Sequence, residues 1–406
     1  MQKKDLLFVI GSLESGGAEK SLITLLNLLD YEKLNVDLLI FNRQGIFIDQ
    51  VPSKVKILQE IEFIKYFNYS YGKSIAHLKK LDKRLVLSRT YFSFKSKVSK
   101  EKVKHVQRSW KLVAKHIPPL EKKYDIAIAY LEMWPTYFVV EKVQAAKKIG
   151  YIHTDYQQYG MDDKFDYPYF KEMDYLVTVS TLCEAALVKT FPDFKGKIRV
   201  LENIVSKQMI EKLVDEGEGF GDHFDGIKLL TIGRLDFNKG YDLAIETCLR
   251  LKENGFNIRW YAIGNGTNKN DFFNMIEKHH LMDAFIFLGT FANPYKFLKE
   301  ADLYIHPSRM EGKSIAIEEA KALSKPIIVT DFDTASEQIE NEYTGLIVPQ
   351  TVEGLYEGIK RLIEDVSLKE KLVTNLKSIV ATNEKETLAS FYNLVLSEEK
   401  KEANVK

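Results

Sequence analysis

The chain of 406 residues is too long for one hydrophobic core, so its length predicts two domains. Apolar residues make up 45% of the sequence, which excludes a largely disordered protein, and a net charge of +1 gives the whole chain no strong field. The two cysteines, Cys183 and Cys248, have no metal-like spacing, and we expect free thiols in a reducing compartment.

The N-terminus resembles the start of a signal peptide, because Lys3 and Lys4 precede the apolar run LLFVI. That run is too short, and Asp5 and Glu14 flank it, so we predict instead a buried strand that enters a glycine loop. No apolar run approaches the roughly 18 residues of a membrane span. We therefore expect a cytoplasmic protein.

Strand-like apolar runs alternate with helical patterns along most of the chain. The first half holds one predicted helix, at 18–29, and strands at 6–10, 36–41, 125–131, 147–153 and 174–180. The second half repeats the rhythm, with strands at 227–233, 257–264, 285–289, 302–306 and 326–330 and helices at 240–253, 268–280, 294–300 and 314–323. This alternation predicts an α/β fold of two doubly wound parallel sheets with helices on both faces.

A stretch rich in glycine and acidic residues, DEGEGFGD at 215–222, lies near the junction of the two halves. We predict an N-terminal domain at 1–205, a C-terminal domain at 206–383, and a final helix with a solvated tail at 384–406. The assignment of ligands to these domains follows from the motifs described below.

A basic insertion interrupts the first half at about 65–123. Within it, residues 79–123 carry 15 Lys and Arg against three acids. One interpretation is an exposed helical insertion, and a second is attachment to an anionic membrane surface. Binding to nucleic acid is a third, which we disfavour because the segment has no RNA- or DNA-binding signature.

Two carboxylates, Glu311 and Glu319, lie eight positions apart where a predicted strand and loop lead into a helix. Ser314 is the expected N-cap, so Glu311 precedes the helix and Glu319 lies inside it. The separation, at most roughly 12 Å, is wide for a glycosidase pair at about 5–9.5 Å. The pair fits two ends of an extended ligand, with helix-start amides that favour a phosphate between them. Since carboxylates accept hydrogen bonds from sugar hydroxyls, these features together predict a nucleotide sugar.

Cations for a diphosphate follow the strand at 227–233, where Arg234 and Lys239 lie in a short loop. The alternative is that these two side chains only form salt bridges at the end of the strand. Gly264 and Gly266 follow the next strand and let the backbone approach a ligand closely, which alone is a weak signal. Other polar candidates at strand ends are His153, the speculative acceptor contact Glu132, and His306, which we interpret as structural.

The segment Asp331-Phe332-Asp333 has the spelling of a metal-binding Asp-x-Asp. It follows a predicted strand and is more simply a turn before a helix. Because Arg234, Lys239 and the helix start already supply positive charge, we expect no essential metal.

Several segments together resemble the retaining glycosyltransferases of family 4, which have the GT-B fold. The C-terminal half carries GRLDFNKG, AIGNG, HPSRMEGKSIAIEEA, KPIIVTDFDTASEQI and TGLIVP in the family's order, and the E-x7-E element is Glu311 and Glu319. The N-terminal half matches more loosely, through ESGGAEKSL and GYIHTDY. The resemblance implies two Rossmann-like domains that face a central cleft, with the last helix packing back toward the N-terminal domain. The N-terminal domain at 1–205 would bind the acceptor, and the C-terminal domain at 206–383 would bind the nucleotide sugar.

The resemblance also implies roles for individual residues. Arg234 and Lys239 would hold the diphosphate, Glu319 the ribose and Glu311 the hexose, and His153 would lie at the anomeric centre beside the acceptor. The remaining donor-binding residues implied are Gly16, Gly17, Gly264, Gly312, Lys313, Ser314 and Ile315, with the backbone amides of the last two facing phosphate or sugar. The chain departs from the family at Lys313, where an apolar residue is common, and at Asn203-Ile204-Val205, where Asn-Pro is frequent.

These observations predict a retaining, metal-independent glycosyltransferase without a cofactor. It would move a hexose or N-acetylhexosamine from a nucleoside diphosphate sugar, foremost a UDP-sugar, to a glycan or polyprenyl-linked acceptor in surface polysaccharide synthesis. We expect no nucleic-acid partner and a cytoplasmic protein that is peripheral on the membrane face. The alternatives are a nucleotide-sugar epimerase or phosphorylase of the same architecture and a non-catalytic, membrane-associated binding module. Donor, acceptor, linkage and oligomeric state stay open.

Overall fold

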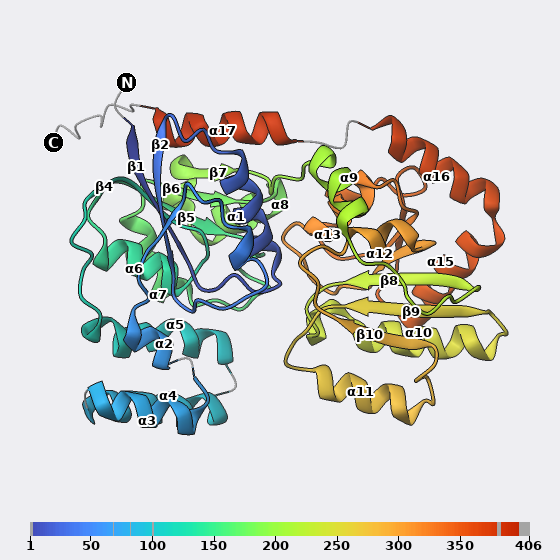
Figure 1. Ribbon diagram of the computed structural model, residues 1–406, viewed down its shortest axis with the longest axis horizontal. Helices are drawn as coiled ribbons and strands as arrows, with labels where there is room; N and C mark the ends of the chain where they lie inside the picture. The colour runs from blue at the N-terminus through green and yellow to red at the C-terminus, as the bar shows by residue number, and fades with distance from the viewer. Residues whose placement is uncertain (1–2, 68, 82, 100, 380–382, 398–406) are drawn as a thin grey trace.

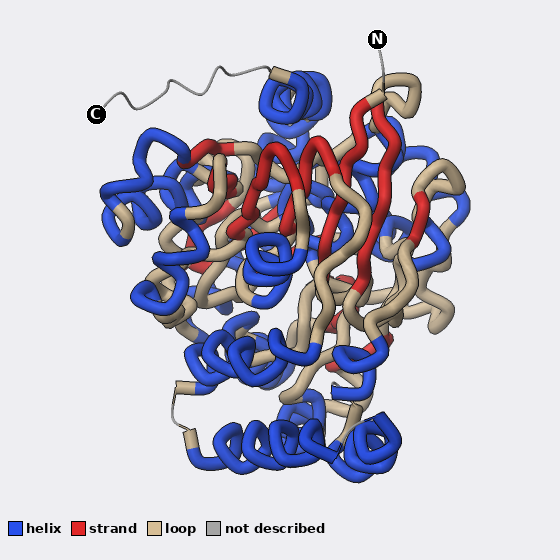
Figure 2. Tube along the Cα trace, turned by 90° about the vertical axis from the view of Figure 1, so that its left-hand side faces the viewer, coloured by secondary structure: helices blue, strands red, loops and turns tan. Residues whose placement is uncertain are grey.

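The computed structural model describes residues 3–67, 69–81, 83–99, 101–379 and 383–397. Two parallel sheets lie side by side, each covered by helices on both faces (Figures 1 and 2). We call the regions built on them the N-terminal and C-terminal domains. The doubly wound α/β architecture predicted from the alternation is confirmed, and the tail predicted at 398–406 lies outside the described residues.

The N-terminal sheet has seven strands in the order β3-β2-β1-β4-β5-β6-β7. Their bounds are β1 (Lys4–Ile10), β2 (Leu34–Ile40), β3 (Lys56–Ile57), β4 (Tyr124–Ala129), β5 (Ala145–Ile152), β6 (Tyr175–Thr178) and β7 (Ile198–Val200). The short strands β3 and β7 were not predicted, because two or three residues are too few for a hydrophobic period. The apolar run at 6–10 is fully buried in β1, as expected for a strand between two layers of helices.

The C-terminal sheet has six strands in the order β10-β9-β8-β11-β12-β13. Their bounds are β8 (Ile227–Ile232), β9 (Ile258–Ile263), β10 (Phe285–Gly289), β11 (Leu303–His306), β12 (Ile327–Thr330) and β13 (Leu346–Val348). In both sheets all pairings are parallel. The chain reverses its direction of winding between β1 and β4 and again between β8 and β11, and such switch points are where open α/β sheets bind ligands.

The helices that cover the N-terminal sheet are α1 (Gly17–Leu28), α6 (Trp134–Lys142), α7 (Asp163–Lys171) and α8 (Thr181–Thr190). Those of the C-terminal domain are α9 (Lys207–Glu216), α10 (Tyr241–Glu253), α11 (Lys269–Lys278), α12 (Tyr295–Glu300), α13 (Ile315–Ala322), α14 (Ala335–Gln338), α15 (Val352–Glu364) and α16 (Val366–Ser378). The helices predicted in this half all form, within two residues of their predicted ends. Among the described helices, none has the length and apolar character needed to cross a lipid bilayer.

The last helix, α17 (Glu384–Leu396), crosses back over the N-terminal domain (Figure 1). Phe391 stacks on Phe8 of β1 with ring centroids 6.3 Å apart, and Val395 is fully buried in the same core. Tyr392 accepts a hydrogen bond from the backbone N–H of Asp30 at 2.5 Å. The predicted return of the C-terminal helix to the N-terminal domain is confirmed.

The basic insertion is helical, but only part of it is an exposed layer. It contains α2 (Glu62–Phe67), α3 (Tyr71–Leu81), α4 (Lys83–Val98) and α5 (Lys102–Val113). Phe67 of α2 and Trp110 of α5 are buried in the core of the N-terminal domain. Figures 1 and 2 show α3 and α4 beyond them, on the side away from the sheet. An exposed helical insertion, which was one interpretation of 79–123, therefore describes only part of that segment, because α5 also buries side chains in the core.

Candidate functional site

A cavity of about 430 Å³ lies between the two domains. The loops that line it follow β1, β4 and β5 on one side and β8 and β11 on the other, so both switch points open into it. Most of the residues singled out from the sequence line this cavity: Gly16, Gly17, Glu132, His153, Arg234, Lys239, Glu311, Gly312, Lys313, Ser314 and Ile315. A smaller adjoining cavity is lined by Gly264 and Glu319. The tertiary structure therefore brings all of the predicted site residues together.

Glu311 is the most heavily paired carboxylate of the site. Its Oε1 atom accepts hydrogen bonds from Lys239 Nζ at 2.5 Å, His306 Nε2 at 2.7 Å and Ser308 Oγ at 2.7 Å. Burial alone would favour the neutral acid, but the Lys239 ammonium and the His306 ring hold the pKa of Glu311 well below its usual range. Within the described chain the other oxygen, Oε2, makes no hydrogen bond. Glu311 is thus ionised with one oxygen left for a ligand.

His306 orients Glu311, in agreement with its interpretation as a structural residue. Its Nδ1 atom lies 3.0 Å from the hydroxyl of Tyr304, which leaves Nε2 toward the carboxylate. Both rings come from β11 and are buried.

The loop after β8 places two cations differently. Asp236 accepts hydrogen bonds from the backbone N–H of Lys239, and Gly240 then turns the chain into α10 in the left-handed region at φ 67°. A side chain at Gly240 would clash with the carbonyl oxygen of Pro307. This turn directs Lys239 to Glu311, whereas Arg234 is exposed and its guanidinium has no hydrogen bond or ion pair among the described residues. Arg234 is therefore the cation that a ligand could bind without displacing a partner.

The start of α13 differs from the prediction. Ser314 occupies the N-cap position, but its hydroxyl makes no capping hydrogen bond. Instead, the side chain of Gln338 forms two hydrogen bonds with the backbone of Ser314. Its Oε1 accepts from Ser314 N at 2.8 Å, and its Nε2 donates to Ser314 O at 2.8 Å. The expectation that the Ser314 amide faces a ligand was wrong, because a distant glutamine already uses it. Ile315, the first residue of the helix, remains on the cavity wall.

Glu319 has a partner that the sequence analysis missed. Lys20 of α1 forms an ion pair with its Oε1, and the Tyr295 hydroxyl donates to the same oxygen at 2.9 Å. The Lys20 ammonium also lies 4.5 Å from the centroid of the Tyr295 ring. Lys20 comes from the other domain, so this pair crosses the cleft. One signal was available, since a lysine near the N-terminus of a helix opposes the helix dipole.

Two glycines act through backbone packing. A Cβ atom on Gly264, whose φ is 156°, would lie 1.9 Å from the carbonyl oxygen of Gly233. One on Gly312 would lie 2.3 Å from the carbonyl oxygen of His153. Gly264 therefore lets two C-terminal loops touch each other, and its predicted approach to a ligand stays a prediction. Gly312 lets the loop after β11 reach across the cleft to the end of β5.

The wall formed by the N-terminal domain carries buried titratable groups that form no ion pair among the described residues, although the Arg234 guanidinium is close enough to lower the pKa of Glu132 and of Glu19 against the larger effect of burial. Burial lowers the pKa of His153 to about 4, and its Nε2–H donates to Tyr130 O at 3.0 Å. In this tautomer Nδ1 is an acceptor, and it has no partner in the described part of the chain, like the hydroxyl of Thr154. Glu132 accepts from the backbone N–H of His153 at 3.2 Å, and burial raises its pKa. His153 and Thr154 of this wall thus offer neutral hydrogen-bonding groups to a ligand.

Glu19 was also missed, although it lies in the quoted segment ESGGAEKSL. It lines the same cavity from the first turn of α1, and burial raises its pKa. Met133, the neighbour of Glu132, has φ 66° and precedes α6, a backbone conformation that is costly for a side chain of its size.

Lys313, the residue that departs from the family pattern, bonds to the connection between the domains. Its Nζ lies 2.6 Å from Oε1 of Glu202, just after β7. Oε2 of Glu202 accepts from the Asn383 side chain at 3.0 Å, and the same amide nitrogen donates to Asn203 O at 3.0 Å. Glu202 and Asn383 belong to the two segments that connect the domains. Lys313 thus ties the loop after β11 to both connections.

The Asp-x-Asp segment forms a turn before α14. Asp333 accepts a hydrogen bond from Gln158 of the N-terminal domain, and the Asp331 backbone N–H donates to Val348 O at 2.8 Å. Among the described residues, no three or more His, Cys, Asp or Glu side chains form a cluster that could hold a metal ion.

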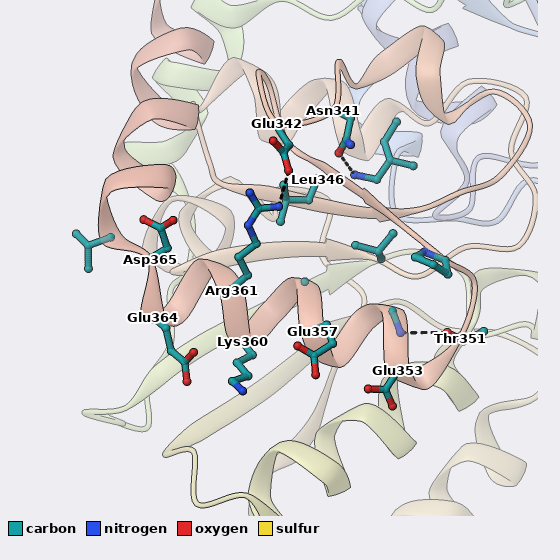
Figure 3. Close-up of a pocket in the computed structure, with 16 residues that line it drawn as sticks. Asn341, Glu342, Leu346, Thr351, Glu353, Glu357, Lys360, Arg361, Glu364 and Asp365 are labelled. Atoms are coloured by element: carbon teal, nitrogen blue, oxygen red, sulfur yellow. Dashed lines mark hydrogen bonds and ion pairs between the residues drawn. The ribbon is translucent and has the colours of Figure 1, made fainter.

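A larger hollow, of about 880 Å³, lies along α15 in the C-terminal domain (Figure 3). Five acidic and two basic side chains line it, and Arg361 pairs with Glu342 at 2.5 Å. None of the predicted site residues lines it, although Leu346, Ile347, Val348 and Pro349 of the quoted TGLIVP segment do. Charged side chains of both signs along an exposed helix indicate a solvated surface.

Comparisons with known proteins place the motif-rich half in context. Residues 223–379 match the family model of the glycosyl transferases group 1. A Campylobacter jejuni N-acetylgalactosamine-N,N'-diacetylbacillosaminyl-diphospho-undecaprenol 4-alpha-N-acetylgalactosaminyltransferase is 25% identical over 47% of this chain and 51% of its own. Protein CapJ of Staphylococcus aureus is 29% identical over 47% of this chain and 46% of its own. The chain therefore spans about half the length of these relatives.

The similarity to a solved structure extends over the whole chain. The Anabaena protein HepE, crystallised with UDP and glucose, superposes with a TM-score of 0.68 at 16% identity, over 97% of this chain and 99% of HepE. This similarity is one of fold, and it confirms the predicted GT-B architecture of two Rossmann-like domains.

Proposed function

We propose that the protein is a retaining glycosyltransferase that transfers a sugar from a nucleoside diphosphate donor. The observation that carries this proposal is the interdomain cavity, where one ionised carboxylate, an unpaired guanidinium and the start of a helix meet a wall of neutral polar groups. The match of residues 223–379 to the group 1 family supports the same class. A hexose or N-acetylhexosamine carried by UDP is the favoured donor.

The donor would lie mainly on the C-terminal domain. Arg234 and the start of α13 supply positive charge for the diphosphate, and Lys239 neutralises charge beside it while paired with Glu311. The unbonded oxygen of Glu311 would accept a hydrogen bond from a hexose hydroxyl. Glu319, in the adjoining cavity, would accept from the ribose hydroxyls after Lys20 is displaced.

The chemical step breaks the bond between the anomeric carbon and the diphosphate and forms a bond to an acceptor hydroxyl on the same face of the sugar. The departing phosphate takes the hydroxyl proton, so the step needs no protein nucleophile. Stabilisation of that phosphate by Arg234 and Lys239 would be the largest contribution. His153, neutral over the physiological pH range, would accept a hydrogen bond through Nδ1 from the sugar or acceptor.

We further propose that transfer needs neither a metal nor a cofactor. The cations of the cavity would take the part that a divalent ion plays in other transferases. Full transfer in excess chelator is the expected result, and complete loss that added metal restores would contradict it.

The acceptor would bind at the N-terminal wall, near His153 and Glu132. A glycan or polyprenyl-linked glycan of surface polysaccharide synthesis is the favoured class, which accords with the diphospho-undecaprenol in the name of the Campylobacter relative. An enzyme on a lipid-linked acceptor would work in the cytoplasm at the membrane face.

The test is incubation with a panel of nucleotide sugars, with and without a lipid-linked acceptor, while free nucleotide and product are followed. A transferase releases nucleotide and forms a product with retained anomeric configuration. An epimerase interconverts the sugars without an acceptor, and a binding module binds the donor and releases nothing. Either of the latter outcomes, or a product with inverted configuration, would overturn the proposal.

A further inference from the structure

An apolar stripe on the outer side of α4 has no partner among the described residues. We define this outer stripe as Leu87, Tyr91, Phe94 and Val98, whose exposed fractions are 72%, 51%, 64% and 58%. Their spacing of four, three and four residues puts them on one side of the helix. Soluble proteins expose single apolar residues routinely, but a row of four large ones marks an interaction surface.

The opposite side of α4 already packs against the protein. Leu85 and Ser88 are buried there, and the ring of Phe92 lies 5.2 Å from Phe67 of α2 and 4.9 Å from His105 of α5. The helix is therefore apolar on two opposite sides. Its inner side satisfies the packing of the fold, so the outer stripe needs a different explanation.

Positive charge surrounds the outer stripe. Lys83 and Lys97 flank it along one edge and Lys95 along the other, and all three are exposed. Together, 71–81 and 83–98, which form α3 and α4, contain eight Lys and Arg and no Asp or Glu. Two copies that paired through this helix would bring like charges together. An anionic surface would instead meet opposite charge at the rim and apolar side chains at the centre.

We propose that the outer stripe inserts into the interface of an anionic lipid bilayer. Leucine, phenylalanine and valine would enter the boundary between headgroups and acyl chains, tyrosine would lie at the headgroup level, and the lysines would contact anionic headgroups. This goes beyond the proposed transfer reaction, which needs the cavity alone. It also differs from a purely electrostatic attachment of the whole basic insertion, because α5 is largely turned into the core.

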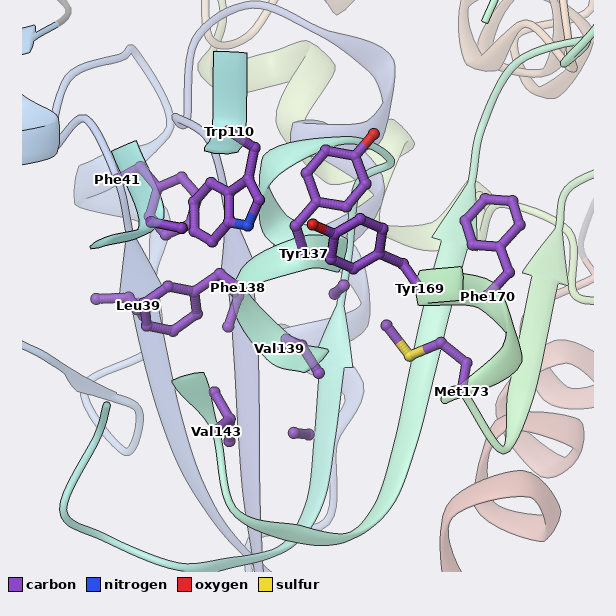
Figure 4. Packing of buried hydrophobic residues seen from close by; sticks show 14 of the residues in the cluster. Leu39, Phe41, Trp110, Tyr137, Phe138, Val139, Val143, Tyr169, Phe170 and Met173 are labelled. Carbon is purple, nitrogen blue, oxygen red and sulfur yellow. The ribbon is translucent and has the colours of Figure 1, made fainter. Parts of the chain in front are cut away.

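The attachment would be mechanically coupled to the acceptor wall. Phe67, which packs on Phe92, also lies 5.8 Å from the ring of Trp134. Trp134 is the first residue of α6, directly after Glu132 and Met133 on the cavity wall, and its Nε1–H donates to Val106 O at 3.0 Å. Trp110 anchors α5 in the same core, next to Tyr137 (Figure 4). A lipid-bound α4 would therefore hold the acceptor wall at a set position relative to the bilayer.

The first experiment is co-sedimentation of the full chain with vesicles of phosphatidylcholine alone or with phosphatidylglycerol. We expect binding only with phosphatidylglycerol. The double variant Leu87→Ser/Phe94→Ser should bind at least about tenfold more weakly. The matched control is Met282→Ser/Val366→Ser, which removes two exposed apolar residues from the C-terminal domain and should bind like the wild type.

The charged rim is tested separately with Lys95→Gln/Lys97→Gln. Loss of each lysine should weaken binding to the anionic vesicles by about fivefold, and the remaining binding should depend less on salt. Equal binding of the stripe variant and the wild type would overturn the proposal. So would a stripe variant that abolishes a dimer in sedimentation velocity while vesicle binding is unchanged, because the partner would then be a second copy.

A second measurement does not depend on loss of binding. Since Cys183 and Cys248 are buried, a Phe94→Cys variant can be labelled selectively with an environment-sensitive fluorophore. Its emission should shift to the blue with anionic vesicles, whereas a label at Met282→Cys should not respond. No shift at position 94 would contradict insertion. Transfer to a water-soluble acceptor should be equal in the stripe variant and the wild type, so the two proposals fail separately.

Discussion

The two walls of the cavity handle buried charge in opposite ways. On the C-terminal side, Glu311 is surrounded by Lys239, His306 and Ser308, and these donors keep it ionised. On the N-terminal side, Glu132 receives a backbone N–H and burial raises its pKa, while burial keeps His153 neutral. A fixed charge array suits a charged donor whose leaving group must be stabilised. A neutral histidine with an acceptor nitrogen suits hydroxyls that must exchange hydrogen bonds during the reaction.

On the C-terminal wall, the substitution with the largest expected effect is Lys239→Ala, which removes the cation beside Glu311. We expect kcat/KM to fall by about 10²–10³, because the departing phosphate loses a cation and Glu311 loses its ion pair. The measurement is release of nucleotide from the best donor of the panel. Lys252→Ala, an exposed lysine on α10 of the same domain, is the control and should retain full activity. Turnover of Lys239→Ala close to that of the control would refute its assigned role.

The N-terminal wall is tested by the pH dependence of stability. The folded-state pKa of His153, about 4, lies below its ordinary value of 6.5, so the unfolded chain binds more protons between these values. Stability should therefore fall as the pH drops from about 6.5 toward 4, and His153→Gln should remove about 1–2 kcal/mol of that loss. The measurement is the free energy of unfolding in denaturant at pH 7 and pH 5. Parallel losses in both proteins would mean that the histidine is not held neutral.

Substitutions at Lys313 test whether the charged groups of the C-terminal wall depend on the segments that connect the domains. Lys313→Met should reduce kcat/KM about fivefold, since the pair with Glu202 is only partly buried. The exchange Lys313→Glu/Glu202→Lys should recover most of that loss if the pair itself matters. Single variants that behave like the wild type, or an exchange that recovers nothing, would show that Lys313 acts otherwise.

The smallest expected effect is on UDP affinity, and it concerns the ion pair between Lys20 and Glu319 that joins the two domains. In Lys20→Met the carboxylate of Glu319 is free for ribose, so UDP should bind about threefold more tightly in calorimetry. Glu319→Gln, which leaves a weaker acceptor in place, should bind UDP more weakly. Weaker binding by Lys20→Met as well would show that the lysine contacts the phosphates.

The elements of this chain were largely predictable because parallel strands buried on both sides read as continuous apolar runs. The helices at 240–253 and 314–323 appeared within a residue or two of their predicted ends. The candidate site was predictable as a set, since polar residues that follow strands collect at one edge of a sheet. Glu311 and Glu319 lie 8 and 16 residues beyond the start of β11 at Leu303, and they open into two adjoining cavities.

What could not be predicted were the partners that come from far along the chain. The Ser314 amide is taken by Gln338, Lys313 by Glu202 and Glu319 by Lys20. Neither hydrophobic period nor local spacing carries this information, because each pair spans 24 residues or more and one crosses the cleft. The exposed side of α4 could not be predicted either, because basic and apolar residues occur all around this helix. Which side is exposed depends on the surface that α2 and α5 cover.

By itself, the sequence determined the α/β class, the two-domain organisation, the strand ends that carry the polar residues and the basic character of the insertion. These follow from local preferences, which depend on residues close together in the chain. Only the tertiary structure decided which carboxylates are charged, which amides are occupied and which side of α4 is exposed. Those properties depend on desolvation and on contacts between distant segments, and both arise only when the two domains and the insertion are packed together.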